Sequence, residues 1–148
     1  MEGIDAYKEK HQNEDYRWPV LQNSHIDLII SGKTCQFKTG CASDKYAGLK
    51  ANLTTSAGTD EEGKILTKPY PANAFQFLIV AHCSDEGRYH FWRIPSPELE
   101  ERGYFSTPTE LGKTGLIVYA PPEKGIGKQP DPEARKQADT WTEKYYTS

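Results

Sequence analysis

The sequence of 148 residues contains little of what marks membrane, secreted or uniformly basic proteins. No apolar run approaches the roughly 18 residues needed to cross a bilayer, so we expect a soluble protein with no membrane partner. The net charge of -3 excludes a uniformly basic nucleic-acid coat but leaves room for a local basic cleft. Cysteine is scarce, and the three cysteines show no close pair spacing, which is typical of reduced thiols in an intracellular protein.

Hydrophobic residues are also few, at 36% of the chain. A chain of this length is one domain by the usual prior, and a low apolar content indicates one compact core with solvated ends. We therefore expect an α/β domain over residues 1–120. Residues 121–148 begin with a stretch rich in proline and glycine, which predicts a linker followed by a helical tail.

Several catalytic signatures are missing. The residues that could be assembled into a zinc site show neither Cys-x-x-Cys nor His-x-x-x-His spacing. They are His25, Cys41, His82, Cys83 and His90. Nothing singles out a cysteine nucleophile, and Gly32-Lys33-Thr34 lacks the upstream glycine of a P-loop. Zinc, cysteine-protease and nucleotide-loop chemistry are therefore weak candidates.

The apolar pattern predicts helices and strands in a mixed order. Strands are expected over 75–83, 88–94 and 116–120, and two more over 26–39 around a turn at 31–34. Helices are expected over 4–13 and 42–52, from Ser96 to Gly103, and over 133–146, with 54–73 as a long surface loop. This order indicates a mixed α/β domain.

The stretch HIDLIISGKTCQFKTG, residues 25–40, places polar side chains within a hairpin that otherwise has the composition of core strands. A two-residue turn at Gly32-Lys33 predicts that Asp27 faces Lys38, with Gln36 between them on the same face. Because side chains alternate along a strand, the other face is apolar. Facing residues lie about 5 Å apart at Cβ. An acid, an amide and an ammonium are therefore expected to converge on one patch.

Two chemical interpretations of this patch remain open. Carboxylate and amide oxygens can bind a hard divalent cation, which lowers the pKa of a bound water and neutralises charge on a phosphate. A neighbouring lysine can position or deprotonate that water, or stabilise the transition state. The same arrangement is also that of an exposed sheet face with an Asp27–Lys38 ion pair, which contributes about 0–1 kcal/mol.

The segment Asp27…Gln36-Phe37-Lys38 resembles the signature of the PD-(D/E)XK nucleases, the restriction-endonuclease-like superfamily, in its Gln-x-Lys variant. The later FQFLIVAH…RYHFWRIPSPELEERG is similar to a strand, aromatic strand and short helix of several members. The resemblance implies a restriction-endonuclease-like core, with a central mixed sheet flanked by helices. It also implies hydrolysis of nucleic acid, foremost double-stranded DNA, with Mg²⁺ or Mn²⁺, by a homodimer or a larger assembly.

The resemblance further implies roles for single residues. Asp27 would be the metal carboxylate, and Gln36 would supply an amide oxygen to the metal or orient water. Lys38 would hold the nucleophile or the charge of the transition state. Because Gln36 stands where the family usually has an acid, a catalytically inactive module that binds nucleic acid or protein is the alternative. An unrelated α/β interaction domain is a third interpretation.

The family often takes a further glutamate from its first helix. Glu9 is the candidate here, as a third metal ligand and catalytic residue, and Glu2 and Glu14 are its rivals. Lysines around the expected loop are either phosphate contacts or part of a solvated surface. They are Lys45, Lys50, Lys64 and Lys68.

Overall fold

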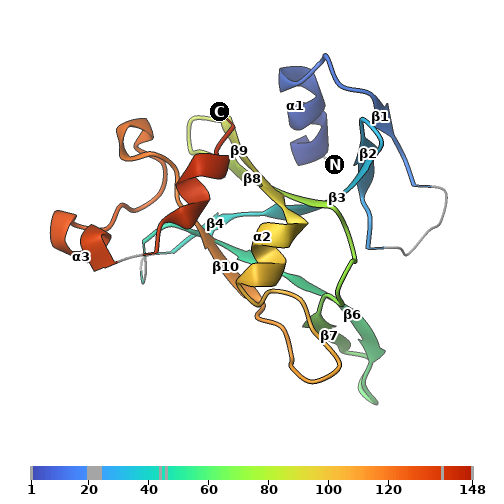
Figure 1. The fold of residues 1–148 in the computed structure, drawn as a ribbon. Coiled ribbons are helices and arrows are strands. Elements are labelled where there is room, and N and C mark those ends of the chain that lie inside the picture. The colour runs from blue at the N-terminus through green and yellow to red at the C-terminus, as the bar shows by residue number, and fades with distance from the viewer. Residues whose placement is uncertain (1, 20–24, 44, 46, 138, 148) are drawn as a thin grey trace.

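The computed structural model describes residues 2–19, 25–43, 45, 47–137 and 139–147. Its main sheet has five strands in the order β1-β2-β3-β8-β9 (Figure 1). They are β1 (Tyr16–Arg17), β2 (Leu28–Ile30), β3 (Lys33–Thr39), β8 (Phe77–Cys83) and β9 (Tyr89–Pro95). β3 and β8 are parallel, and the other neighbours are antiparallel. The predicted mixed α/β fold with a central mixed sheet is confirmed.

Helix α1 (Glu2–Lys10) lies on one face of this sheet. It starts two residues before the predicted helix, and its buried Ile4 and Tyr7 contact the alternating apolar side chains of the strands. The core on this side consists of Ile4, Tyr7, Leu28, Ile30, Cys35, Phe37, Ile79, Ala81 and Phe91. The apolar face predicted for the first hairpin therefore packs under α1.

The other face of the main sheet is covered by a second sheet in the order β10-β5-β4 and by short helices. These elements are β4 (Cys41–Ala42), β5 (Leu49–Asn52), β10 (Gly115–Val118), α2 (Ser96–Glu101) and the 3-10 helix η2 (Trp141–Tyr145). Strand β8 sends Leu78 and Val80 into this core and Ile79 into the core under α1. The predicted strand over 75–83, buried on both faces, is confirmed from Phe77 onward, two residues after its predicted start.

The predicted helix over 42–52 is wrong, because β4 and β5 occupy this stretch. Leu49, Ala51 and Leu53 are all buried in the same core, which is the two-residue period of a strand and not the period of a helix. β5 pairs with β10, more than 60 residues away in sequence (Lys50 with Ile117). Tertiary pairing therefore decides the conformation of this segment.

The predicted surface loop over 54–73 is also wrong for most of its length. It forms a two-stranded hairpin of β6 (Thr54–Thr59) and β7 (Ile65–Pro69), which projects from the body of the molecule (Figure 1). Most of its side chains are exposed. Its base reaches the candidate site described below.

The tail forms two short helices where one is predicted over 133–146: α3 (Pro132–Gln137) and η2, preceded by the 3-10 turn η1 (Pro122–Lys124). η2 packs on the body, where the backbone N–H of Tyr119 donates to Oγ1 of the fully buried Thr142 at 2.8 Å. The predicted boundary between residues 120 and 121 stays a prediction. In the described part of the chain no helix has both the length and the apolar character that crossing a bilayer requires.

Candidate active site

The turn between β2 and β3 lies at Ser31 and Gly32, whose φ angles of +48° and +81° match a type I′ hairpin. Ile30 pairs with Lys33, so the register differs by two residues from the predicted one. The predicted facing pair of Asp27 and Lys38 is therefore wrong. A shift of two residues keeps the alternation of side chains, and the polar side chains still share one side of the hairpin.

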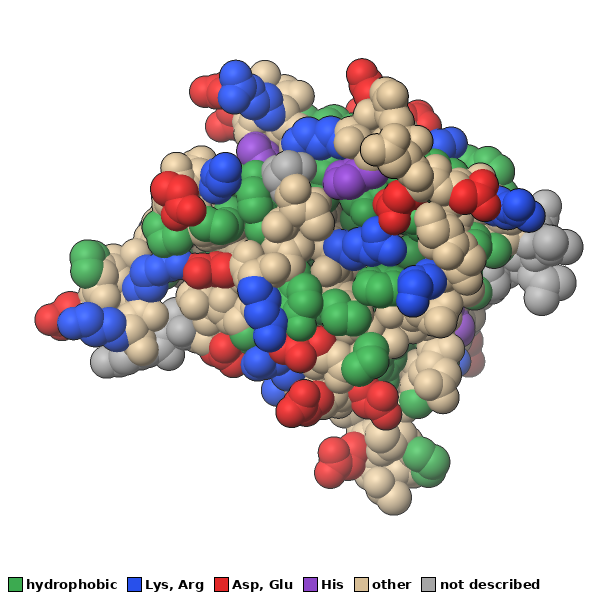
Figure 2. All heavy atoms as spheres, turned by 45° about the horizontal axis from the view of Figure 1, so that its top comes forward, with side chains coloured by type: hydrophobic (Ala, Val, Ile, Leu, Met, Phe, Trp, Pro, Cys, Tyr) green, Lys and Arg blue, Asp and Glu red, His purple; other side chains and the backbone are tan. Residues whose placement is uncertain are grey.

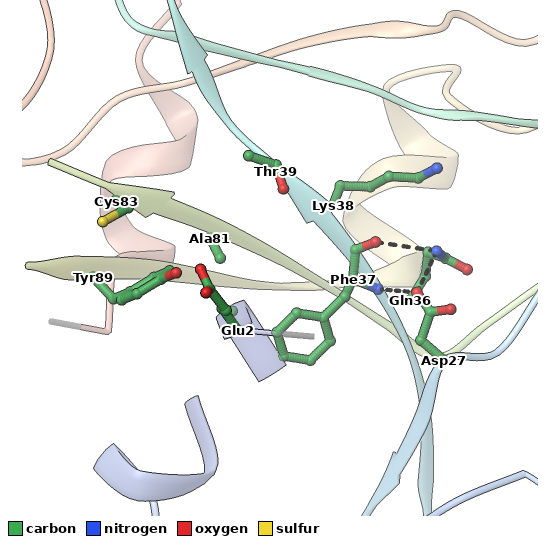
Figure 3. A pocket seen from close by; sticks show the side chains of 10 residues that line it. Glu2, Asp27, Gln36, Phe37, Lys38, Thr39, Ala81, Cys83 and Tyr89 are labelled. Atoms are coloured by element: carbon green, nitrogen blue, oxygen red, sulfur yellow. Dashed lines mark hydrogen bonds between the residues drawn. The ribbon is translucent and has the colours of Figure 1, made fainter. Parts of the chain in front are cut away.

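Asp27 is fixed by two hydrogen bonds to the next strand (Figure 3). Its Oδ2 accepts from Gln36 Nε2 at 2.6 Å and from the backbone N–H of Phe37 at 2.9 Å. Gln36 Nε2 also donates to the Phe37 carbonyl at 3.1 Å. The other carboxylate oxygen of Asp27 and the amide oxygen of Gln36 point to the side on which Lys38 extends (Figure 3). Two oxygen atoms and an amine thus lie on the same side of the hairpin.

Lys38 is held by a partner that the sequence analysis did not identify. Its Nζ donates to the Thr54 carbonyl at 2.9 Å and lies 5.2 Å from the centroid of the Tyr70 ring. Burial lowers the pKa of this ammonium from the ordinary value of 10.5, and the Asp27 charge partly opposes that shift. Lys38 and Asp27 form no salt bridge in the described part of the chain. The Asp27 charge therefore acts on Lys38 through space, without a direct ion pair.

Tyr70 is a second residue that the sequence analysis missed. It is buried, and burial together with the Asp27 charge raises the pKa of its hydroxyl to about 12. The His25 ring contacts Tyr70 edge-on at 5.4 Å, and its Nδ1 lies 3.3 Å from Thr55 Oγ1. The β-branched residues on both sides of the turn at 60–63 were the signal for this hairpin.

Asp27, Gln36 and Lys38 line a pocket of about 590 Å³ between the hairpin and the start of α1 (Figure 3). It is lined by Glu2, Gly3, Asp27, Gln36, Phe37, Lys38, Thr39, Ala81, Cys83 and Tyr89. The structure therefore brings Asp27, Gln36 and Lys38 together in one pocket.

The three glutamates considered for the first helix lie in different places. Glu2 lines this pocket, on the other side of the Phe37 ring from Asp27 (Figure 3). Glu9 is exposed and lines a separate hollow, and Glu14 pairs with Arg93 at 2.9 Å. The structure thus does not bring Glu9 together with Asp27 and Gln36.

Metal-binding side chains are sparse. No group of three His, Cys, Asp or Glu residues that could hold a metal occurs among the residues that the structure describes. The zinc site considered from the sequence is therefore not assembled. Mg²⁺ differs from zinc, because it keeps several waters and is often bound through one or two carboxylates and substrate phosphates. The oxygens of Asp27 and Gln36 fit that kind of ligand set.

Lys38 is the one basic side chain among the described residues that line the pocket, so they do not form a strongly basic cleft. Acidic and basic side chains are interspersed over the face shown in Figure 2. The lysines considered as phosphate contacts do not line the pocket; they are Lys45, Lys50, Lys64 and Lys68. Their contact with phosphate stays a prediction.

No protein-family model and no curated protein matches the chain. Similar solved structures include the crystal structure of MepB, with a TM-score of 0.60 and 19% identity over 99% of this chain and 96% of that one. They also include a bacterial homing endonuclease, I-Ssp6803I, with a TM-score of 0.58 and 13% identity over 87% of this chain and 80% of that one. At such identities the likeness establishes the fold alone. The chain has a nuclease-like, mixed α/β fold.

Proposed function

We propose that the protein is a metal-dependent endonuclease that hydrolyses phosphodiester bonds in nucleic acid, foremost in double-stranded DNA. The observation that carries this proposal is the convergence of Asp27, Gln36 and Lys38 on one pocket of a nuclease-like fold. These three side chains supply an anionic oxygen, a neutral oxygen and an amine. These groups suit the hydrolysis of a phosphodiester with a divalent cation, because oxygens bind the ion and a cationic amine stabilises charge on the phosphate.

Asp27 and Gln36 would hold Mg²⁺ or Mn²⁺ through the two oxygens that point to the Lys38 side. When bound, the ion lowers the pKa of water and neutralises charge on the phosphate. The two donors on Asp27 Oδ2 fix the orientation of the carboxylate, so that its second oxygen is presented in one direction. Preorganisation of this kind reduces the reorganisation needed in the transition state.

Lys38 would act on the attacking water and on the charge that develops on the phosphate. A lowered pKa makes its neutral amine easier to form than that of an exposed lysine, so it can accept a proton from water. The Thr54 carbonyl and the Tyr70 ring keep the amine beside the pocket. Of the three helix glutamates considered, Glu9 and Glu14 lie outside the pocket, and Glu2 lines it on the far side of the Phe37 ring from Asp27, so none of them is a metal ligand in this proposal.

The test is nicking of supercoiled plasmid DNA with Mg²⁺, Mn²⁺, Ca²⁺ or a chelator. We expect cleavage with Mg²⁺ or Mn²⁺ and none with the chelator. Asp27→Asn and Lys38→Met should each reduce the rate by roughly 10²-fold or more, the usual size of a lost catalytic group. Lys33→Met is the matched control, because Lys33 lies on the same strand but is exposed and outside the pocket. It should cleave at the wild-type rate.

Melting temperatures and circular dichroism spectra separate loss of chemistry from loss of folding. Replacing a desolvated, hydrogen-bonded charge by an apolar side chain of similar length is often close to neutral for stability. We therefore expect Lys38→Met to unfold within a few degrees of the wild type. Metal-dependent cleavage that persists in both Asp27→Asn and Lys38→Met would overturn the proposal.

A catalytically silent module that binds nucleic acid is the second candidate, and one observation favours it. Gln36 donates its amide N–H to Asp27 Oδ2, so the position where the resembled family usually has an acid holds a neutral side chain that occupies one oxygen of the neighbouring carboxylate. Fluorescence anisotropy with labelled duplex DNA distinguishes the two candidates. Binding without cleavage in any of the metals would support the silent module.

A further inference from the structure

A second pocket, of about 370 Å³, lies beside the turn that joins β8 to β9. It shares no lining residue with the candidate active site. It is lined by Ala42, His82, Ser84, Asp85, Glu86, Arg88, His90, Lys124, Gly125, Ile126 and Gly127. Two imidazoles and two cations thus come from three separate parts of the chain.

The two histidines face each other across the antiparallel pair of β8 and β9. His82 Nδ1 lies 2.8 Å from the Gly40 carbonyl, and since a carbonyl only accepts, Nδ1 carries the proton. His90 Nδ1 lies 2.8 Å from the Tyr146 hydroxyl. Both rings are therefore oriented through Nδ1, and these bonds leave Nε2 of each ring unused. In the protonated form of each ring, Nε2 is a donor.

The charged surroundings of His90 are basic. Burial is the main cause that lowers the pKa of His90 from 6.5, and the cations Lys10, Arg88 and Lys124 together with His82 lower it further. Lys10 belongs to α1, and its Nζ donates to the Tyr89 carbonyl. An anion placed among these groups would relieve their mutual repulsion.

The acidic residues of the pocket do not neutralise its cations by contact. Asp85 and Glu86 lie in the turn between β8 and β9 and also line the pocket. In the ranges that the structure covers, neither forms a salt bridge with Arg88 or Lys124. Both cations are exposed at the mouth and can turn toward a ligand.

We propose that this pocket binds a phosphate group through Arg88, Lys124 and the protonated imidazoles of His82 and His90. A tetrahedral oxyanion accepts hydrogen bonds from several directions, which suits donors that come from three parts of the chain. The guanidinium of Arg88 matches two phosphate oxygens at once. The source is either a phosphate monoester, such as a terminal phosphate, or a phosphodiester of a nucleic-acid backbone. The proposal does not depend on nuclease activity.

Phosphate binding in this pocket depends on pH, because it is coupled to protonation of the imidazoles. The bound anion favours the charged imidazoles, so it raises the pKa of His90. By reciprocity, phosphate binds more tightly as the pH falls, by up to about tenfold per pH unit for each histidine that must take up a proton. A monoester can also donate from its own hydroxyl below its second pKa of about 6, which a diester cannot do.

Histidine ring signals of the full-length protein test the proposal, because the sequence contains only four histidines. Inorganic phosphate is titrated at pH 6 and pH 8 and followed by ¹H–¹³C NMR, with chloride at equal ionic strength as the reference. Single His82→Asn and His90→Asn variants assign the signals. We expect saturable shifts of His82 and His90, larger at pH 6, while His11 and His25 stay in place. Shifts that chloride reproduces, or that all four histidines share, would overturn the proposal.

Variants and two nucleotide probes complete the test. Arg88→Gln and Lys124→Gln should each weaken phosphate binding by about tenfold or more, which is the size expected for one lost charged hydrogen bond. Lys113→Gln, at an exposed lysine outside the pocket, is the control and should bind as the wild type does. Near-ultraviolet circular dichroism checks that each variant is folded.

Thymidine 5′-monophosphate and a thymidine dinucleotide without a terminal phosphate distinguish the two sources. A response to the monophosphate alone assigns the pocket to terminal phosphate. A response to the dinucleotide as well assigns it to the nucleic-acid backbone. No response of His82 and His90 to inorganic phosphate or to either nucleotide would refute a phosphate site.

Discussion

At the scale of single residues, Lys38 shows how burial and charge act against each other. Its ammonium loses water in the fold, and the Thr54 carbonyl and the Asp27 charge only partly replace it. A purely structural role would be served as well by an apolar side chain. The charged amine of Lys38 at this position is what the proposed chemical role requires.

His90 is the residue for which the fold predicts the clearest dependence of stability on pH. Its pKa in the fold is lower than the ordinary value of 6.5, so protons favour the unfolded chain. The stabilising contribution is complete above pH 6.5 and is lost as the pH falls through the pKa of the folded state. We expect the free energy of unfolding to decrease from pH 7.5 to pH 5, and to decrease less in His90→Asn.

Urea denaturation in phosphate-free buffers at the two pH values measures this difference. The His11→Asn variant is the matched control, because it also replaces a histidine but His11 is not among the groups that lower the pKa of His90. An equal loss of stability on acidification in wild type and His90→Asn would contradict the prediction. Other titrating groups contribute equally to both proteins and cancel in the comparison.

At the scale of elements, local signals decided which segments were predictable. The helix that starts at Ser96 was predicted from a capping hydroxyl, a proline and an acid in sequence; α2 begins there, but its N-cap is Pro95 and no side chain caps it. β8 and β9 were predicted from long apolar and aromatic runs. β5 was not predicted as a strand. It has only four residues, and the pairing with the distant β10 that fixes its conformation cannot be recognised from local sequence.

The entry to β5 gives a prediction about a single backbone position. Gly48 has a φ of +81°, and a Cβ there would lie 2.5 Å from Ile117 Cγ2. Gly63 has a φ of +83°, and no atom lies within 4 Å of the position that a Cβ would take. Replacing Gly63 by alanine therefore measures the cost of the positive φ alone. We expect Gly63→Ala to cost about 1 kcal/mol and Gly48→Ala about 2–4 kcal/mol, because the clash adds to the strain.

Chemical denaturation of both variants measures these costs. Near-equal stabilities would show that β10 moves aside at no cost, which would contradict a tightly packed second sheet. Nuclease assays on Gly63→Ala should be unchanged, since the turn lies outside the candidate pocket.

At the scale of the whole molecule, two cores lie on opposite sides of one sheet and share strands β8 and β9. The sequence predicted this sheet and the polar side of the first hairpin, because alternation within a strand is local. It did not predict Thr54 and Tyr70 beside Lys38, since they come from a hairpin with exposed side chains and few apolar signals. The polar side of the hairpin can therefore be predicted from local sequence, whereas the contacts of Lys38 with Thr54 and Tyr70 depend on the tertiary structure.

Shared strands predict that the two cores unfold together. Leu78 and Ile79 are neighbours on β8, are both fully buried, and point into opposite cores. We expect Leu78→Ala and Ile79→Ala each to cost about 2–5 kcal/mol. Each variant should show one transition, coincident by far-ultraviolet circular dichroism and tryptophan fluorescence.

Ser56→Ala, on the exposed β6, is the matched surface control and should unfold as the wild type does. Separate transitions by the two probes, in either variant, would show that the cores are independent units. That outcome would place a structural boundary within the main sheet.

The parallel pairing of β3 with β8 has a consequence for how the protein is made. Cys35 pairs with Phe77, 42 positions later, and Lys38 pairs with Val80. While the ribosome has released only the first 70 residues, the β2–β3 hairpin can form but its parallel neighbour does not yet exist. The nascent chain therefore carries Asp27, Gln36 and Lys38 without the wall that Ala81, Cys83 and Tyr89 supply. Assembly of the pocket waits for translation of β8 and β9.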